Sequence, residues 1–367
     1  MFRISKELDI TIDNISLIKY PINEVIFFDI ETTGFSPETS ILYMIGCIYY
    51  QQNHFICSQW FSDTMEAQKD IIIAFMEFIK NFKVLVCYNG QGFDIPYLTK
   101  KCTIYNLPYD FNNIECIDIY KYIAPYKSLF KTDNLKQKTM ESFIGLSRED
   151  QYSGGELIAF YEKYLLNHSN DILDILVLHN HDDLVGMTKL ISLLAYPMVF
   201  NEKLNLKKLE EINNPSYDQF PNKEIHFQME LSNKVPKRVT CGNNTFYLTL
   251  YENIAELSVK AYTRELKYFY PNYKDYYYLP IEDTAIHKSI AFYVDKNFKT
   301  RAKAANCYSK KTGCFLPQYN EIICPYFKID YYDKETYFEF TDEFKSDNTA
   351  IANYFLHVVN HLLKQSK

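Results

Sequence analysis

Three apolar runs follow one another near the start of the chain. EVIFFDIE, ILYMIGCIYY and HFICSQWF lie between residues 24 and 61 and are rich in β-branched and aromatic residues. The polar stretches TTGFSPETS and QQN separate them. This pattern predicts three consecutive antiparallel strands.

The hydrophobic period then changes from that of a strand to that of a helix. MEAQKDIIIAFMEFIKNF (65–82) is amphipathic and predicts a helix, and KVLVCYN (83–89) predicts a buried strand. We expect another strand near residues 114–120 and helices at 94–103, 134–144, 156–167 and 170–195. This order of elements indicates an α/β fold, in which helices flank a mixed five-stranded sheet.

The apolar periodicity breaks over residues 201–223, where Asn, Pro and charged residues cluster. We therefore expect a first domain at 1–200, a linker at 201–223 and a smaller α+β domain at 224–367. The elements expected in the second domain are hairpins at 239–250 and 326–340, a helix at 282–295 and a closing helix at 349–365.

Composition and charge narrow the class of protein. With 47% hydrophobic and 23% charged residues, the chain is typical of a globular protein. The net charge of −7 is unevenly divided, with −9 on residues 1–200 and +2 on residues 201–367. An acidic half suits a carboxylate metal site, and the other half supplies cations for phosphate.

No apolar run approaches the roughly 18 residues of a membrane span, and the N-terminal residues lack the apolar core of a signal peptide. We therefore expect a cytoplasmic protein with no membrane partner. The nine Cys residues favour reduced core thiols over disulfides, because several lie in apolar runs. Zinc binding is the weaker interpretation, since no C-x-x-C pair is present; its ligands would be Cys307, Cys314 and Cys324, with Cys241 or His287.

The first motif with chemical potential is FFDIETTG, which contains Asp29 and Glu31. Two residues apart on a strand, these carboxylates leave the same face of the sheet. Their desolvation is costly unless a hard divalent cation, such as Mg²⁺ or Mn²⁺, binds them. The alternative is a strand that ends in solvent, but the adjoining small-residue turn favours a metal site. We expect Thr32 in that turn to contact nucleic acid.

The second motif is VLVCYNGQGFDIPYL, in which Asp94 follows a buried strand and a Gly-containing turn. Asp94 is expected to open a helix and to reach the same metal site, although an ordinary helix N-cap is the alternative. Asn89 and Phe93 are expected to line the groove and to contact the last nucleotide.

The third motif is LVLHNHDDLVGMTKL. His179 and Asp183 lie four residues apart on a predicted helix and therefore on one face, whereas His181 and Asp182 point elsewhere. A histidine beside bound metal ions can deprotonate or orient the attacking water. The alternative for this motif alone is a solvated helix face.

Together the three motifs resemble those of the DEDD exonucleases, in the same order along the chain. From about Phe27 to Leu190 the sequence is also similar to the YprB family of ribonuclease H-like proteins. That similarity includes MESFIGLSREDQYSGGELIAFYEKYL, between the second and third motifs. The H-x-x-x-D spacing matches the tyrosine-type enzymes rather than the usual histidine-type gap, so the role of His179 stays open.

The resemblance implies a ribonuclease H-like fold and metal binding by four carboxylates, those of Asp29, Glu31, Asp94 and Asp183. It also implies phosphodiester hydrolysis with two Mg²⁺ or Mn²⁺ ions, with His179 as the base. By analogy, Asp29 bridges both ions, while Glu31 and Asp183 share the ion that activates water. Asp94 contributes directly or through water.

The segment from Lys288 to Lys311 contains seven Lys or Arg residues and one acid, Asp295. Aromatic residues interleave with these cations, as in proteins that bind single strands. We expect this segment to bind nucleic acid, through cations that include Lys296, Lys299, Arg301 and Lys303. A solvated basic surface is an equal alternative.

Three function classes follow from the motifs. The favoured one is a divalent-metal-dependent 3′–5′ exonuclease that acts on single-stranded DNA or RNA. A structure-specific endonuclease of the same fold is the second. A catalytically inactive nucleic-acid-binding protein is the third, and it is the least favoured because all five site residues are present.

Overall fold

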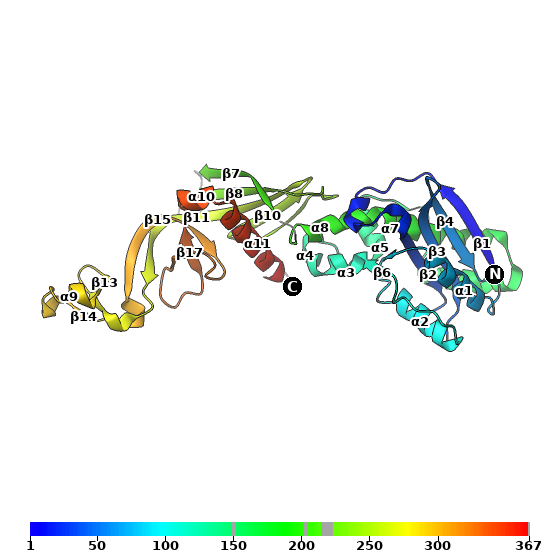
Figure 1. Ribbon diagram of the computed structural model, residues 1–367, viewed down its shortest axis with the longest axis horizontal. Coiled ribbons are helices and arrows are strands. Elements are labelled where there is room, and N and C mark those ends of the chain that lie inside the picture. The colour runs from blue at the N-terminus through cyan, green and yellow to red at the C-terminus, as the bar shows by residue number, and fades with distance from the viewer. Residues whose placement is uncertain (149–151, 202–203, 214–222, 366–367) are drawn as a thin grey trace. The chain divides into compact units, whose positions relative to one another are not determined.

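The computed structural model describes residues 1–148, 152–201, 204–213 and 223–365. Residues 149–151 of the Arg-containing loop and residues 214–222 of the predicted linker lie outside the described residues. The chain divides into two compact units (Figure 1). The first comprises Met1–Met198 with Val235–Lys237, and the second comprises Val199–Lys234 with Arg238–Lys367.

The first unit is built on a six-stranded mixed sheet. In spatial order its strands are β1 (Phe2–Leu8), β4 (His54–Phe61), β3 (Leu42–Gln51), β2 (Val25–Thr32), β5 (Val84–Cys87) and β6 (Glu115–Asp118). The predicted antiparallel arrangement of β2, β3 and β4 is confirmed. Strands β5 and β6 add in parallel on the other side of β2.

The prediction of five strands missed β1, which pairs antiparallel with β4 at the edge of the sheet. Its sequence, FRISKEL, alternates the apolar residues Phe2, Ile4 and Leu8 with polar ones, but Lys6 interrupts the apolar face, so the periodic signal is short and weak. Tertiary contacts hold it instead. The Arg3 guanidinium lies 4.8 Å from the ring centroid of Trp60 on β4, a cation–π contact.

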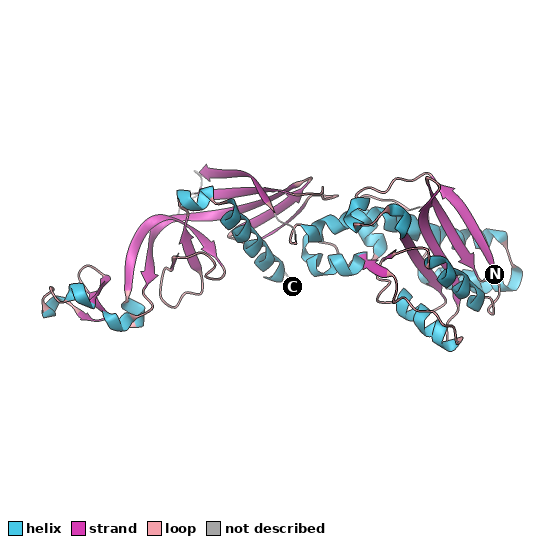
Figure 2. Cartoon of the chain, viewed as in Figure 1, coloured by secondary structure: helices cyan, strands magenta, loops and turns pink. Residues whose placement is uncertain are grey.

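Helices cover both faces of this sheet (Figure 2). The helices of the first unit are α1 (Gln68–Ile79), α2 (Asp94–Ile104), α3 (Ile119–Ile123), α4 (Lys127–Phe130), α5 (Gln137–Phe143), α6 (Gly154–Asn167), α7 (Asn170–Leu190) and α8 (Ala195–Met198). Apolar residues of α1 and α2 pack against one face, where Phe28 and Ile30 are buried. Residues of α6 and α7 pack against the other, around Tyr43 and Phe61. The predicted helices are confirmed, with ends shifted by a few residues.

The second unit is a mainly antiparallel β structure. Its larger sheet contains β7 (Asn205–Asn213), β8 (Lys223–Glu230), β9 (Val239–Gly242), β10 (Phe246–Tyr251), β11 (Ile254–Phe269), β15 (Tyr308–Gln318), β16 (Tyr326–Phe327) and β17 (Thr336–Glu339). A small sheet contains β13 (Thr284–His287), β12 (Tyr276–Leu279) and β14 (Thr300–Arg301). Its helices are α9 (Lys288–Ala291), α10 (Asp342–Ser346) and α11 (Asn348–Gln365).

Both predicted hairpins, β9–β10 and β16–β17, and the closing helix α11 are present. The helix predicted at 282–295 is wrong, because residues 284–287 form β13, paired with β12, and only the four residues of α9 are helical. Strand pairing therefore overrides the local pattern. Residues 205–213, predicted as linker, form β7 and pair with β8.

All nine cysteines are free thiols. Within the described part of the chain, no helix combines the length and the apolar composition that a bilayer span requires.

Candidate metal centre and active site

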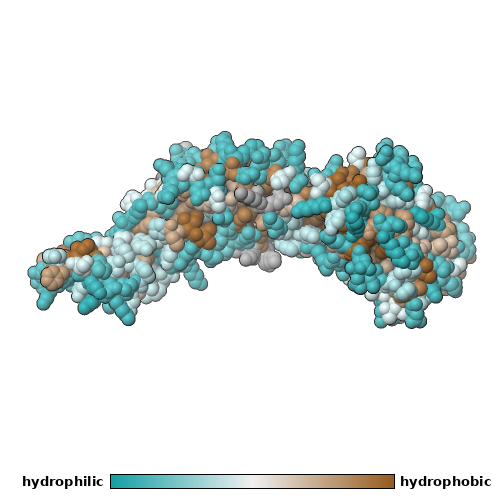
Figure 3. Space-filling view, viewed as in Figure 1, coloured by the Kyte–Doolittle hydropathy of each residue, from teal (hydrophilic) through white to brown (hydrophobic). Residues whose placement is uncertain are grey.

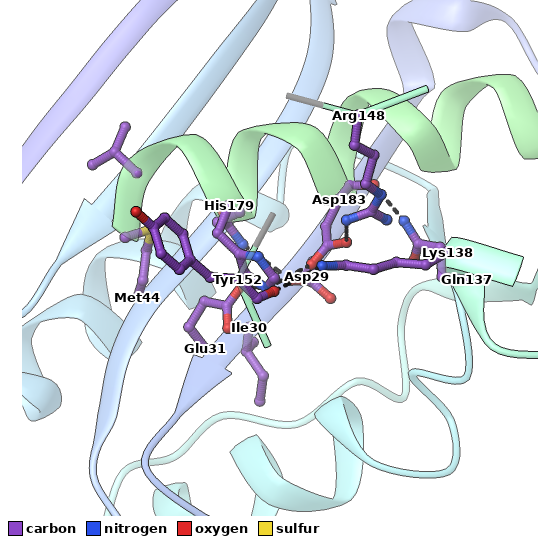
Figure 4. Close-up of polar contacts among 12 residues, drawn as sticks. Asp29, Ile30, Glu31, Met44, Gln137, Lys138, Arg148, Tyr152, His179 and Asp183 are labelled. Carbon is purple, nitrogen blue, oxygen red and sulfur yellow. Dashed lines mark hydrogen bonds and ion pairs between the residues drawn. The ribbon is translucent and has the colours of Figure 1, made fainter. Parts of the chain in front are cut away.

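The alternation of side chains along β2 separates the core from the candidate site. Phe28 and Ile30 point into the core beneath α1 and α2. Asp29 and Glu31 leave the opposite face of the strand, where residues of α7 contact them. Figure 4 shows these two carboxylates together with His179 and Asp183 of α7. The prediction that both acids share a face is therefore confirmed.

The side chains of Glu31, His179 and Asp183 converge. His179 Nε2 lies 3.3 Å from Asp183 Oδ2 and 3.7 Å from Glu31 Oε1. Among the described residues, these three form the set of His, Cys or carboxylate groups that places one donor atom of each within 4.8 Å of the others. His181 and Asp182 lie outside this set, and His181 Nδ1 lies 3.4 Å from Asp182 Oδ1.

Asp29 and Asp94 flank this set without belonging to it. The Asn180 amide donates a hydrogen bond to Asp29 Oδ2 at 3.0 Å. Asp94 is the first residue of α2, as predicted, and its Oδ1 accepts a hydrogen bond from the Ile30 backbone N–H at 3.2 Å. The end of β2 therefore brings Asp94 beside the other acids.

Burial and mutual repulsion perturb these carboxyl groups. Burial, followed by the charges of neighbouring acids, raises the pKa of Asp29 well above its usual value. Burial raises the pKa of Glu31 to about 7, against the attraction of His179. Burial also raises the pKa of Asp94 to about 7. The protein alone thus leaves the charged forms under-compensated, and a bound cation would relieve this cost.

The residues present fit a divalent metal ion. Glu31 Oε1 is buried and accepts no hydrogen bond from any described residue, although buried carboxylate oxygens normally have a partner. A donor set of carboxylate oxygens and one imidazole nitrogen suits Mg²⁺ or Mn²⁺ better than it suits a structural zinc ion. None of the cysteines considered for zinc joins a metal-binding set among the described residues.

Arg148 is a site residue that motif reasoning did not single out. Its Nη1 lies 2.5 Å from Asp183 Oδ1, and its other nitrogens pair with Glu141. Burial opposes the charged form of Arg148, but Glu141 and Asp183 outweigh it and raise the pKa. Gln137 donates to the Asp183 backbone carbonyl at 2.7 Å (Figure 4). The sequence signal that could have identified Arg148 is its place in MESFIGLSREDQYSGGELIAFYEKYL, the segment between the second and third motifs that resembles the YprB family.

Asn180 was also missed, although it stands beside His179. It is fully buried, and its Oδ1 accepts a hydrogen bond from Gln59 Nε2 at 3.0 Å. Its neighbour on β3 is Gly46, where a Cβ would lie 1.9 Å from Asn180 Oδ1 and would displace the amide from this position. The close approach of α7 to the sheet therefore fixes the amide that faces Asp29.

A buried acid anchors the turn before Asp94. Asp118 at the end of β6 accepts hydrogen bonds from the backbone N–H groups of Asn89, at 2.8 Å, and Gln91, at 3.1 Å. Asn89 has a φ of 60°, a left-handed conformation that asparagine tolerates better than most residues. Its side chain is exposed. These contacts explain how the turn directs Asp94 toward β2.

The remaining predicted contacts in the first unit lie near the site. Phe93 immediately precedes Asp94, and its ring centroid lies 6.0 Å from that of Phe35, which is 91% exposed. Phe35 was not predicted. The Thr32 hydroxyl donates to the Gly34 carbonyl at 2.9 Å and so stabilises the turn after β2. The contacts of Phe93 and Thr32 with nucleic acid stay predictions.

The four predicted basic contacts belong to the second unit. Lys296 and Lys303 are exposed, and the guanidinium of exposed Arg301 lies 4.9 Å from the ring centroid of Tyr277. Lys299 differs, because its ammonium donates to the backbone carbonyls of Ala291 and Val294.

Residues 26–195 match the family model of the RNase H superfamily. A family B DNA polymerase from Pyrobaculum calidifontis is 17% identical, with a TM-score of 0.38 over 48% of this chain and 24% of the polymerase. A chain of an ExoI/SSB-Ct complex is 10% identical, with a TM-score of 0.31 over 62% of this chain and 55% of that chain. No curated protein matches the sequence.

Proposed function

Because residues 26–195 form a ribonuclease H-like domain, we propose that this protein is a divalent-metal-dependent nuclease. More specifically, we propose that the protein is a 3′–5′ exonuclease that hydrolyses single-stranded DNA or RNA. The observation that carries the proposal is the convergence of Glu31, His179 and Asp183, flanked by Asp29 and Asp94. The polarity and the YprB affiliation rest on the resemblance of the three motifs.

The proposed cofactors are two Mg²⁺ or Mn²⁺ ions, held by Asp29, Glu31, Asp94 and Asp183. When bound, such ions activate the attacking water and neutralise charge that develops on the phosphate. The lack of a hydrogen-bond partner for Glu31 Oε1 among the described residues and the raised carboxyl pKa values support a cation at this place.

The chain's own residues position the reacting groups. His179 is the proposed proton acceptor, and its Nε2 lies 3.7 Å from Glu31 Oε1 and 3.3 Å from Asp183 Oδ2, beside the proposed metal ligands. Arg148 binds Asp183 through Oδ1, so that Oδ2 stays directed toward His179. Asn180 holds Asp29 in an analogous way through Oδ2.

A digestion panel tests the proposal. Purified protein is incubated with end-labelled single-stranded and duplex DNA and RNA, in Mg²⁺, Mn²⁺, Ca²⁺ or EDTA, with Asp183→Asn as the matched inactive control. We expect stepwise shortening of single strands in Mg²⁺ or Mn²⁺, and no activity in EDTA or Ca²⁺, whose looser coordination misplaces the water. Metal-independent cleavage would overturn the mechanism.

A terminal block separates the remaining function classes. If the 3′ end carries a blocking group, an exonuclease of the proposed polarity leaves the strand intact, whereas an endonuclease still cuts it. Binding without hydrolysis under every metal condition would instead support the inactive nucleic-acid-binding alternative.

A further inference from the structure

An exposed aromatic surface lies at the small sheet of the second unit. Ile290, Phe292, Tyr293 and Phe298, here called the aromatic tip, are 61%, 81%, 86% and 53% exposed. Figure 3 shows hydrophobic surface at the end of this unit, where Figure 1 labels α9. Four large, exposed apolar side chains within nine residues make this segment a candidate binding surface.

Short-range contacts order the segment that carries these side chains. The Phe292 and Tyr293 ring centroids lie 5.4 Å apart, edge to face. Lys299 donates to the carbonyls of Ala291 and Val294, which ties the segment around Phe298 to the end of α9. Asp295 accepts from the Asn297 backbone N–H at 2.8 Å. The aromatic tip is therefore presented by a hydrogen-bonded turn.

The basic residues around this turn fall into two groups. Lys288 pairs with Asp275 at 2.6 Å, and Lys310 pairs with Asp283. By contrast, the exposed side chains of Lys296, Arg301 and Lys303 form no ion pair with a carboxylate in the described part of the chain. These three cations remain available to an anionic partner.

The combination of exposed rings and unpaired cations selects a partner. Single-stranded nucleic acid offers unpaired bases that stack on aromatic side chains, with phosphates at regular spacing beside them. A duplex offers the same phosphates but keeps its bases stacked on one another. An apolar protein partner would engage the rings but would have no need of the cations.

We propose that the aromatic tip, with Lys296, Arg301 and Lys303, is a binding site for single-stranded nucleic acid. The rings stack on bases and the cations contact phosphates. This inference rests on the proposed function for its choice of partner, but it concerns a site outside the metal centre. It narrows the basic segment identified in the sequence to these residues and gives Lys299 a supporting role.

Binding is measured without cleavage, by fluorescence anisotropy of a labelled oligo(dT) or oligo(U) strand with the full-length Asp29→Asn protein in EDTA. In this background Tyr293→Ala is compared with Tyr332→Ala. Tyr332 is also 86% exposed, lies in the same unit, and packs edge to face on Tyr331 as Tyr293 does on Phe292. We expect Tyr293→Ala to weaken binding about 5- to 100-fold and Tyr332→Ala to leave it unchanged.

A salt titration isolates the cations. Each phosphate contact that is lost on a single strand makes the negative slope of log K against log salt shallower by roughly 0.7. The Lys296→Ala, Lys303→Ala double variant should therefore reduce the slope by about 1.4. Lys334→Ala, at an exposed position of the same unit, should leave it unchanged.

Several outcomes would overturn this site. If Tyr293→Ala weakened binding no more than Tyr332→Ala does, the aromatic tip would not be a specific stacking site. Duplex binding as tight as single-strand binding would show that unpaired bases are not recognised. If the tip variants instead abolished self-association of the chain or binding to anionic lipid vesicles, with strand binding intact, the surface would serve that partner. If the wild-type protein hydrolysed no nucleic acid but strand binding still depended on the aromatic tip, the proposed nuclease function would fail and this binding site would stand.

Discussion

Neutralising Glu31 is expected to stabilise the metal-free protein while impairing its metal site. The pKa of Glu31 is raised from 4.5 to about 7 by burial among other acids. A raised folded-state pKa means that the folded protein holds the proton more tightly than the unfolded chain does. The associated stability is fully present below about pH 4.5 and is lost as the pH rises through about 7.

The magnitude follows from the size of the shift. Between the ordinary value of 4.5 and about 7, the cost of the charged form is about 3 kcal/mol. Glu31→Gln keeps the shape of the side chain and removes this cost. In EDTA at about pH 8, the variant should therefore melt roughly 5–10 °C higher than the wild-type protein. At about pH 4.5 the two should melt together.

Intrinsic fluorescence provides an assay that is confined to the first unit. Trp60 is the chain's single tryptophan, and it is 3% exposed on β4, in the core of that unit. Its emission during heating reports the unfolding of the domain that contains the site. Glu162→Gln, at an exposed position on α6, serves as the matched control and should show no pH-dependent gain.

The metal supplies the second half of the test. Mn²⁺ at about 100 times its dissociation constant should stabilise the wild-type protein by about 2.7 kcal/mol at pH 8. Glu31→Gln should gain much less, because an amide is a poorer ligand for a hard cation. A variant that is less stable than the wild-type protein in EDTA at about pH 8 would refute the inferred repulsion. An equal gain from Mn²⁺ in both proteins would refute Glu31 as a ligand.

Three further predictions concern catalysis. Asp29→Asn and Asp183→Asn should each abolish hydrolysis while the circular dichroism spectrum stays unchanged; full activity in both variants would disprove the site. His179→Ala should lower turnover about 100-fold or more, and His181→Ala much less, since two residues rotate a helix by about 200°; equal impairment would show that the inferred role of His179 is wrong. Asn180→Leu keeps the bulk but removes the donor to Asp29, so kcat should fall about 10- to 100-fold with KM nearly unchanged; unchanged kcat would show that Asp29 needs no such support.

Local spacing was sufficient to predict the main elements and part of the site. The two-residue period of a strand places Asp29 and Glu31 on one face of β2. The four-residue spacing places His179 and Asp183 on one face of α7, where their side chains lie 3.3 Å apart. These relations follow from the geometry of a single element, so they do not depend on how the rest of the chain packs.

The supporting residues could not be predicted in this way. Asn180 contacts Asp29 across 151 residues of sequence, and Arg148 joins Glu141 to Asp183 from a separate segment. Neither residue stands at a spacing that marks it as functional in the sequence. Asn180 acquires its role only because α7 packs close to β3 at Gly46, a contact that no local pattern reveals.

By itself the sequence determined the order of the strands β2 to β4, the helices of the first unit and the faces on which its acids lie, because apolar periodicity records which side of an element is buried. Only the tertiary structure decided the pairing of β1, the strand β13 in place of a helix, the hydrogen bond to Asp29 and the ion pair with Asp183. The pairing of β1 and the contacts of Asp29 and Asp183 depend on partners distant in sequence, whereas β13 pairs with the neighbouring strand β12. In β13 the energy of strand pairing outweighs a weak local preference for helix.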